Sequence, residues 1–452
     1  MLEQIKRTFQ EKGIHKVKLG GFDIDGILRG KYVSTDKFLS VAEKGLGFCD
    51  VVFNWDSNDE LYGTPAKLTG DGYPDLLAKI DLDTFRQIPW EPDTAFFILD
   101  FFRDQETPFP LCPRRLLRTV IDQANEMGFQ PFASLEYEYF LFKETADSLE
   151  EKGFKNLVPM SPGAFGYSVL RASAAAEFVH TVVDSMAEYD VTLEGIHTET
   201  GPGVYETAIK YDMALRSADK AGLFKTGVKE ICAKQGLVAT FMAKWSPDYP
   251  GCSGHLHQSL WDLDAERNYF SDTADSLGIS GTMKHYIGGQ KQLMPEMMAL
   301  VCPTVNSYKR IVPGSWAPVN ASWGIENRTA AIRAIPGQGE KSTRVEYRLA
   351  GADAHPHIAL AASLAAGLYG IRHQIDPEDP LITNAYEADE NQFESLPQSL
   401  LDAINRLDQS DTVREILGSD FVDHYVMTRR WEYDNFSKAV TDWERQRYFE
   451  II

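Results

Sequence analysis

Four segments of this chain have the apolar character of buried β-strands, yet they carry charged or polar side chains at every second position. Successive side chains of a strand point to opposite faces, so residues two apart lie on the same face. An unpaired charge inside a protein costs much free energy, so such a face needs a ligand or a counter-ion. The fold must therefore place a polar site on the face of a sheet.

The first two segments supply carboxylates. In SLEYEYFLF, Glu136 and Glu138 share a strand face. In HTETGPGVYE, His197 and Glu199 share a face, and the Gly-Pro-Gly turn then brings the chain round to present Glu206. Like charges this close together favour a bound cation.

The other two segments add imidazoles and guanidiniums. After the glycine-rich approach in PGCSGHLHQSL, His255 and His257 alternate, and the glycines permit close contact with a ligand. In STRVEYRLAG, Arg344, Glu346 and Arg348 share one face. Glutamates with one or two histidines form an oxygen-rich set that suits Mg²⁺ or Mn²⁺.

Further arginines extend this interpretation. Arg310, Arg328 and Arg333 follow nearby in the sequence and are more than a bare cation site needs. Arginine forks bind transferring phosphoryl groups, so metal and arginines together indicate nucleoside triphosphate chemistry.

Composition excludes several classes of protein. The net charge of −21 would repel a polyanion, which argues against binding to nucleic acid or an anionic membrane. The five cysteines are scattered and form no CxxC pair, as expected of a reduced cytoplasmic protein. The N-terminus lacks the apolar core of a signal peptide, and the apolar run 357–371 is short for a membrane span.

The pattern along the chain predicts an α+β protein of two domains. Residues 1–107 have a short helix and then strand-like segments, whereas residues 108–452 mix helices and strands. Helices are expected over 172–189 and 211–235, ATFMAKW is expected to be a strand, and 384–412 to be a solvated linker with a surface helix.

Each motif also has a structural interpretation. A single ExE or HxH in a strand is more often a solvated edge than a ligand pair. The other structural interpretations are a hydrogen-bonded core histidine at His197, a turn or cap at Asp56 and Asp59, an ion pair between Arg344 and Glu346, and a packing role for Cys252. Four such strands in one chain are much harder to assign to chance.

The succession of motifs resembles the glutamine synthetase family over essentially the whole chain, and within it the γ-glutamyl amide (glutamate-amine) ligases. The motifs are LEYEYFLF, HTETGPGVYE, ATFMAKW with GCSGHLHQSL, NSYKRIVPG, ENRTAAIR and RVEYRLAGADAHPHIALAASLAAGLYGI. The resemblance implies an N-terminal β-grasp domain and a catalytic domain whose curved antiparallel sheet forms a metal-binding funnel. It also implies a homo-oligomer, a dodecamer of two stacked hexameric rings with active sites between subunits.

The resemblance assigns roles residue by residue. One metal would be held by Glu138, Glu199 and Glu206, and a second by Glu136, His255 and Glu346, with two or three Mg²⁺ or Mn²⁺ ions per site. The residues His257, Arg328, Arg333 and Arg344 would contact ATP, and Gly251, Arg310 and Arg348 would hold the amino-acid substrate. Arg328 would also act on the transferring group.

Departures from the family pattern bear on the substrate. Ammonia-using members carry a Pro-Gly-Tyr-Glu-Ala-Pro flap, whereas residues 313–318 read Pro-Gly-Ser-Trp-Ala-Pro, with Trp316 at the glutamate position. An indole offers an organic amine an apolar or cation-π surface. The family's Pro-Gly-Gln is Gly203-Val204 here, and its Asn-Gly is Pro250-Gly251. Asp56 of a neighbouring subunit is the first candidate for the amine's counter-ion, and Asp59 is the second.

The resulting prediction is an ATP-dependent ligase that joins the γ-carboxylate of glutamate to an organic primary amine through γ-glutamyl phosphate. The alternatives are an ammonia-using glutamine synthetase and a catalytically silent scaffold. A metal-dependent hydrolase is a further alternative, but it would not need so many arginines.

Overall fold

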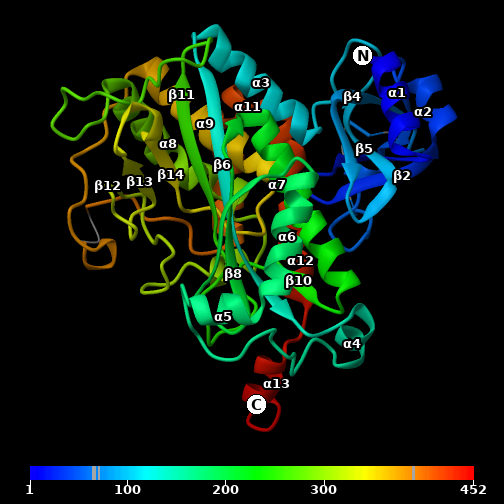
Figure 1. Cartoon of the computed structure of the whole chain (residues 1–452). Helices are drawn as coiled ribbons and strands as arrows, with labels where there is room; N and C mark the ends of the chain where they lie inside the picture. The colour runs from blue at the N-terminus through cyan, green and yellow to red at the C-terminus, as the bar shows by residue number, and fades with distance from the viewer. Residues whose placement is uncertain (64–67, 70–71, 389–391) are drawn as a thin grey trace.

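The N-terminal residues form a small mixed sheet with two helices beside it (Figure 1). The computed structural model describes residues 1–63, 68–69, 72–388 and 392–452. In the described part, this sheet has five strands in the order β2-β1-β5-β4-β3, and β1 runs parallel to β5. Its elements are α1 (Leu2–Lys12), β1 (Lys16–Phe22), β2 (Leu28–Ser34), α2 (Thr35–Val41), β3 (Leu46–Cys49), β4 (Asp75–Ile88) and β5 (Glu91–Phe102). The division at 107/108 stays a prediction.

The larger part of the chain builds a second, mainly antiparallel sheet. Among the described residues it has nine strands, seven of them in the order β12-β13-β14-β11-β6-β8-β7, while β9 and β10 pair with β6. The strands are β6 (Gln130–Phe142), β7 (Leu193–Thr198), β8 (Val204–Ile209), β9 (Asp212–Met213), β10 (Val238–Thr240), β11 (Gly254–Trp261), β12 (Trp323–Ile325), β13 (Ile332–Ile335) and β14 (Arg344–Tyr347). The α+β fold with a curved antiparallel sheet is confirmed, although β12 and β13 run parallel.

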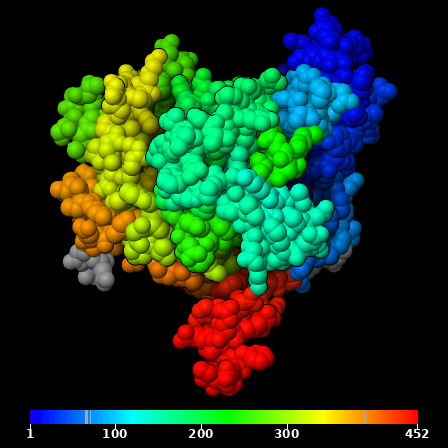
Figure 2. Space-filling view, turned by 60° about the horizontal axis from the view of Figure 1, so that its bottom comes forward, coloured from blue at the N-terminus to red at the C-terminus, as the bar shows by residue number. Residues whose placement is uncertain are grey.

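The α-helices of the larger part are α3 (Pro113–Glu126), α4 (Ala146–Glu151), α5 (Val169–Ala174), α6 (Ala176–Glu188), α7 (Ala214–Lys234), α8 (Gly281–Val301), α9 (Pro356–His373), α10 (Leu400–Gln409), α11 (Asp411–Leu417), α12 (Ser419–Lys438) and α13 (Asp442–Tyr448). Of these, α3 and α7 pack against β6 of the sheet. The apolar run at 357–371 forms α9, which is buried along most of its length. It packs so closely on α8 that a Cβ at Gly289 would lie 2.2 Å from the carbonyl oxygen of Ala366. The glycine permits this close crossing. The short helix α13 stands out from the body of the molecule (Figure 2).

Several expected boundaries differ from the structure. The helix expected over 172–189 is two helices, α5 and α6, because the backbone leaves helical geometry at Ala175. The helix expected from residue 211 begins at Ala214, since Asp212 and Met213 pair with β6. The ATFMAKW strand ends at Thr240. The surface helix expected within 384–412 is α10, which buries one apolar side. Residues 389–391 of the expected linker lie outside the described part.

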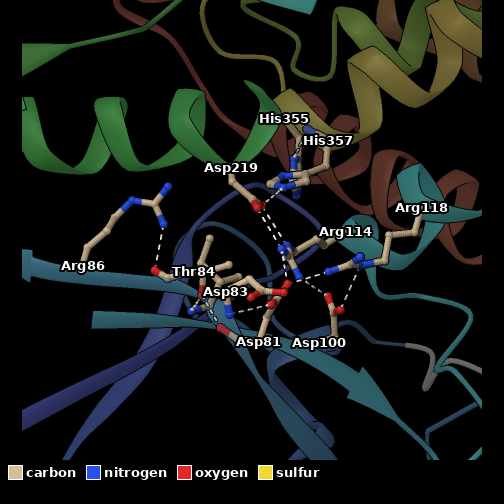
Figure 3. A network of polar contacts seen from close by, with 11 residues as sticks. Asp81, Asp83, Thr84, Arg86, Asp100, Arg114, Arg118, Asp219, His355 and His357 are labelled. Carbon is tan, nitrogen blue, oxygen red and sulfur yellow. Dashed lines mark hydrogen bonds and ion pairs between the residues drawn. The ribbon is translucent and has the colours of Figure 1, made fainter. Parts of the chain in front are cut away.

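A buried network of charges joins the N-terminal sheet to helices α3, α7 and α9 (Figure 3). The guanidinium of Arg114 on α3 donates to both carboxylate oxygens of Asp219 on α7, each at 2.8 Å. It also donates to Asp100 on β5 at 3.0 Å and to Asp81 on β4 at 2.8 Å. His357 at the start of α9 lies 2.8 Å from Asp219. Charged hydrogen bonds therefore fix the N-terminal sheet against the helices of the larger part.

No helix in the described part of the chain combines the length and the apolarity that crossing a membrane requires.

Candidate metal and nucleotide site

Strand register brings many of the predicted polar residues onto one face of the larger sheet. The cross-strand pairs are His197 with Glu206, Glu206 with Glu138, Glu136 with His255, His257 with Glu346, and Glu346 with Arg333. Directly opposed residues of antiparallel strands have their Cβ atoms about 5 Å apart. The period-two pattern of each strand therefore produces a single polar surface built from six strands.

The centre of this surface combines carboxylates with imidazoles. His255 Nδ1 lies 3.4 Å from Glu346 Oε1 and 3.7 Å from Glu136 Oε1. His257 Nε2 lies 3.5 Å from Glu136 Oε2. Both ring nitrogens of His255 are buried without a hydrogen-bond partner in the described part of the chain. A buried imidazole in this position is available to a cation.

A second group of possible ligands lies beside the first. His197 Nε2 is 3.2 Å from Glu206 Oε2, and its Nδ1 is 3.6 Å from Glu199 Oε1. Burial, and then the neighbouring Glu136, raises the pKa of Glu206 to about 11. Burial also raises the pKa of Glu138, although Glu138 accepts a hydrogen bond from the backbone of Ser253 at 2.5 Å. The carboxylates of this group repel one another, so a bound cation would stabilise them.

These donors fit a hard divalent cation. The ligand atoms of Glu136, Glu206 and His255 lie within 4.8 Å of one another, as do those of His197, Glu199 and Glu206. Carboxylate oxygens with imidazole suit Mg²⁺ or Mn²⁺. The structure thus places acidic and histidine side chains where they could bind a metal. The division of the six predicted ligands between two ions stays a prediction, and His197 was not among them.

Two cavities meet at Glu136. One, of about 600 Å³, is lined by Glu138, Glu199, Glu206 and His255 together with Gly251, Trp316, Arg328 and Arg348. The other, of about 410 Å³, is lined by His257 and Arg344 and by the aromatic rings of Phe132, Tyr211 and Trp261. Glu136 lines both of them. Two ligands could therefore approach the metal ligands from separate sides.

Glu346 connects the metal ligands to the arginines. It is 1% exposed and accepts hydrogen bonds from Arg333 at 3.0 Å and from Arg348 at 2.5 Å. Burial opposes ionisation, but Arg348, His255, His257 and Arg333 together outweigh it and lower the pKa of Glu346 to about 2. Arg333 also donates to Glu326 at 2.9 Å, and Arg344 donates to His257 Nδ1 at 3.3 Å. Glu346 is therefore a fixed anion between cationic groups.

Four predicted site residues line neither cavity: Glu346 and Arg333, described above, and Arg310 and Asp56. Arg310 is 1% exposed and lies beneath Gly251, where it donates to Ser253 Oγ at 3.2 Å and to the carbonyl of Leu349. Asp56 lines neither cavity of its own chain. Its carboxylate accepts from the backbone of Asn58 at 2.8 Å and from Trp431 Nε1 at 2.9 Å. A role for Asp56 in the amine site stays a prediction that needs a neighbouring subunit.

The second amine-side candidate is also engaged within its own chain. Asp59 pairs with Arg29 at 2.6 Å and has a φ of 62°. The segment around it therefore has the turn geometry of the structural interpretation.

The structure adds one aromatic residue that the motifs did not indicate. Tyr167 lines the larger cavity and stacks on His197 with ring centroids 4.3 Å apart. Its φ of 55° and the φ of 61° at Trp316 are both in the left-handed region, which non-glycine residues adopt at a cost. Tyr167 follows a glycine in the irregular segment 161–168, where no periodicity singles it out. Two strained aromatic residues thus line the same cavity.

Comparison with known proteins is consistent with this geometry. The family model described as "Glutamine synthetase, catalytic domain" matches residues 110–448. "Type-1 glutamine synthetase 2" of Dictyostelium discoideum is 48% identical over 440 residues, which is 96% of this chain and 84% of that protein. "Glutamate--isopropylamine ligase" of a Pseudomonas species is 38% identical over 450 residues, 99% of this chain and 97% of that protein.

A solved structure has the same fold. The structure titled "GmaS/ADP complex-Conformation 1" is 29% identical in sequence and superposes with a TM-score of 0.86, covering 99% of both chains.

Proposed function

Because the chain belongs to the glutamine synthetase family of ligases, we propose that it joins the γ-carboxylate of glutamate to an organic primary amine with ATP. The proposal of an organic amine as the substrate rests on Trp316. It is 60% exposed and lines the larger cavity where ammonia-using members of the family have a glutamate. An indole face attracts an organic ammonium group and packs against its apolar part, whereas a carboxylate suits the small ammonium ion.

The proposed reaction has two steps. An oxygen of the glutamate γ-carboxylate attacks the γ-phosphorus of ATP, ADP leaves, and γ-glutamyl phosphate forms. The amine nitrogen, after losing a proton, then attacks the carbonyl carbon and expels inorganic phosphate, which leaves a γ-glutamyl amide. The divalent ions would neutralise charge on the phosphoryl oxygens.

The proposed ligands of these ions are the two sets that the family resemblance implies. Glu138, Glu199 and Glu206 would hold one ion, and Glu136, His255 and Glu346 another, of two or three in all.

The two cavities suit the two larger substrates. ATP would occupy the smaller cavity, with His257 and Arg344 at its phosphates and Arg333 behind Glu346. Glutamate would occupy the larger cavity near Gly251 and Arg348. Arg328, which lines the larger cavity, would stabilise the transferring phosphoryl group. Arg310 would act from beneath Gly251.

An ammonia-using glutamine synthetase is the second candidate. The relative named "Type-1 glutamine synthetase 2" is more similar to this chain than the isopropylamine ligase is, at 48% against 38% identity. An assay of glutamate, ATP and Mg²⁺ with ammonia and with alkyl, aromatic and polyamines separates the two by the mass of the amide product. A preference for ammonia would refute the organic amine.

Replacing Trp316 by glutamate is expected to invert the amine preference. The kcat/KM for the organic amine should fall about two- to fivefold, which corresponds to the ~0.5–1 kcal/mol of one exposed cation-π contact, while that for ammonia should rise. Steady-state kinetics with each amine measure both changes. The variant Trp316→Phe keeps an aromatic face and should retain the preference, and Trp316→Gln separates the loss of the ring from the gain of charge. Unchanged preference in all three variants would contradict the role of Trp316.

We also propose that the chain assembles as a dodecamer of two stacked hexameric rings. In such a ring, Asp56 of one subunit would reach the amine side of the next, which its position outside its own larger cavity allows. Mass photometry of the purified protein tests the assembly, and a monomer that is fully active would contradict it.

A further inference from the structure

A short surface segment, residues 381–386, ties together two loops of the larger cavity, and we call it the 381–386 strap. Leu381 and Ala385 of the strap are buried, whereas Ile382 between them is 93% exposed. The backbone N–H of Leu381 donates to the carbonyl of Trp323 on β12 at 2.8 Å. The strap is therefore fixed to the sheet at its buried residues, although it lines neither cavity itself.

The first of these loops carries Arg328. The preceding residue, Asn327, donates through its side-chain amide to two backbone carbonyls of the strap, at 3.1 and 2.9 Å. The following residue, Thr329, accepts at its Oγ1 from the backbone N–H of Ala385, at 2.9 Å. Thr329 Oγ1 also donates to Asn327 Oδ1 at 2.7 Å. Both neighbours of Arg328 are thus held by the strap, while Arg328 itself lines the cavity.

The second loop carries Trp316. Tyr386, the last residue of the strap, donates its phenol O–H to the carbonyl of Ala317 at 3.0 Å. On the other side, Ser315 Oγ donates to the carbonyl of Arg310 at 2.9 Å. Trp316 has a φ of 61°, and a non-glycine residue keeps this conformation only where the surrounding structure holds it. The hydrogen bonds of Tyr386 and Ser315 therefore fix the backbone on either side of Trp316.

The two loops serve the same cavity, which both Trp316 and Arg328 line. In the proposed reaction, Trp316 contacts the amine and Arg328 contacts the transferring phosphoryl group. Ala385 and Tyr386 are adjacent in the strap, and each forms a hydrogen bond to one of the loops. A shift at one loop is therefore transmitted to the other, because a single planar peptide unit joins the two residues that hold them.

We propose that the 381–386 strap positions Trp316 and Arg328 relative to each other, with Tyr386 as the positioning residue of the amine side and Thr329 as that of the phosphoryl side. This inference rests on the proposed ligase reaction, but it holds for any amine. The strap keeps the bound amine aligned with the acyl phosphate that the amine attacks. Alignment of this kind contributes to the rate, because small displacements of the reacting atoms are costly.

The variant Tyr386→Phe removes the hydroxyl and keeps the half-buried ring. The KM for the amine should rise about two- to tenfold, the range expected for the loss of one hydrogen bond, whereas the KM for ATP should stay unchanged. Initial rates at saturating glutamate measure both constants. The control is Tyr425→Phe, which removes a hydrogen bond of the same kind, from a buried phenol to the carbonyl of Ala299 at 2.9 Å, outside both cavities. It should leave the KM for the amine unchanged.

The variant Thr329→Val tests the link between the two loops. Valine has nearly the same shape as threonine but cannot accept from Ala385, so kcat should fall through Arg328 and the KM for the amine should rise as well. Thr329→Ser retains the hydroxyl and should restore both values toward those of the wild type. Because both bonds belong to one strap, Tyr386→Phe combined with Thr329→Val should raise the KM for the amine by less than the product of the two single effects.

Hydrogen exchange followed by mass spectrometry gives a measurement without turnover. In the full chain without substrates, the backbone amides of 314–317 should exchange faster in Tyr386→Phe than in the wild type or in Tyr425→Phe.

Unchanged amine KM and unchanged exchange in Tyr386→Phe would overturn the proposal, as would an equal rise of the amine KM in Tyr425→Phe. A lower kcat with unchanged amine KM in Thr329→Val would also overturn it, because the two loops would then be held independently. None of these outcomes depends on which amine the enzyme uses. If ammonia is the preferred substrate, the organic amine is refuted, and the KM for ammonia is then the constant that tests the strap.

Discussion

Replacement of Glu346 by glutamine is expected to lower kcat by about a thousandfold, equivalent to about 4 kcal/mol of transition-state stabilisation. Glu346 is a predicted metal ligand, and it also holds Arg333 and Arg348. A neutral amide of the same size would keep the packing. It would weaken the binding of the cation and the hydrogen bonds that hold the two arginines. Steady-state phosphate release at saturating ATP and glutamate measures the change.

A matched control separates the metal from the arginine. Glu326 also accepts a hydrogen bond from Arg333, but its side chain is 49% exposed and is not among the predicted metal ligands. Glu326→Gln should therefore reduce kcat far less. Thermal unfolding of each variant with and without Mn²⁺ gives a second measurement. A metal ion present at a hundred times its Kd raises the free energy of unfolding of a protein that binds it by about 2.7 kcal/mol. If Glu346→Gln retains that stabilisation and its kcat, Glu346 is not a metal ligand.

Replacement of Arg114 by methionine is expected to lower the free energy of unfolding by about 3–5 kcal/mol. The guanidinium is the shared donor to three carboxylates, and its loss leaves Asp219 and Asp100 buried without their main partner (Figure 3). Burial raises the energy of each unpaired carboxylate. The urea midpoint measured by circular dichroism should fall accordingly.

Arg115 provides the control on the same helix. Its guanidinium lies 5.3 Å from the centre of the Phe102 ring, and it has no ion pair in the described residues. Arg115→Met should cost about 1 kcal/mol or less. Equal urea midpoints for the two variants would show that the buried network contributes no more than an ordinary surface contact. A double variant, Arg114→Met with Asp219→Asn, should be less destabilised than the two single variants combined.

The sequence could predict the candidate site because its signal is local. Alternation along a strand fixes which side chains share a face, and Glu136, His255 and Glu346 accordingly line one surface. The order of the strands is not local: β6 lies between β8 and β11, and β14 lies beyond β11. The motifs alone therefore could not tell which strands are neighbours. The resemblance to a known family supplied that information.

Other features depend on contacts between distant segments. Arg114 meets Asp219 across 105 residues of sequence, and no periodicity at either position indicates the pair. The burial of Arg310 depends on the chain crossing at Gly251. Asp56 shows the opposite case, since its turn geometry was one of the two interpretations open from sequence. The local pattern thus predicted the kinds of ligand that the site can bind. Tertiary contacts decide which of the predicted side chains reach the two cavities.

Glu136 lines both cavities of the candidate site, so its carboxylate lies where the two adjoin. If nucleotide and amino acid occupy the two cavities as proposed, each reaches the reacting centre by its own opening. Neither substrate then needs to pass through the cavity of the other, and ADP and the amide can leave from separate cavities. Steric access alone then imposes no order of addition, and Glu136 is the residue through which one bound substrate could change the affinity for the other.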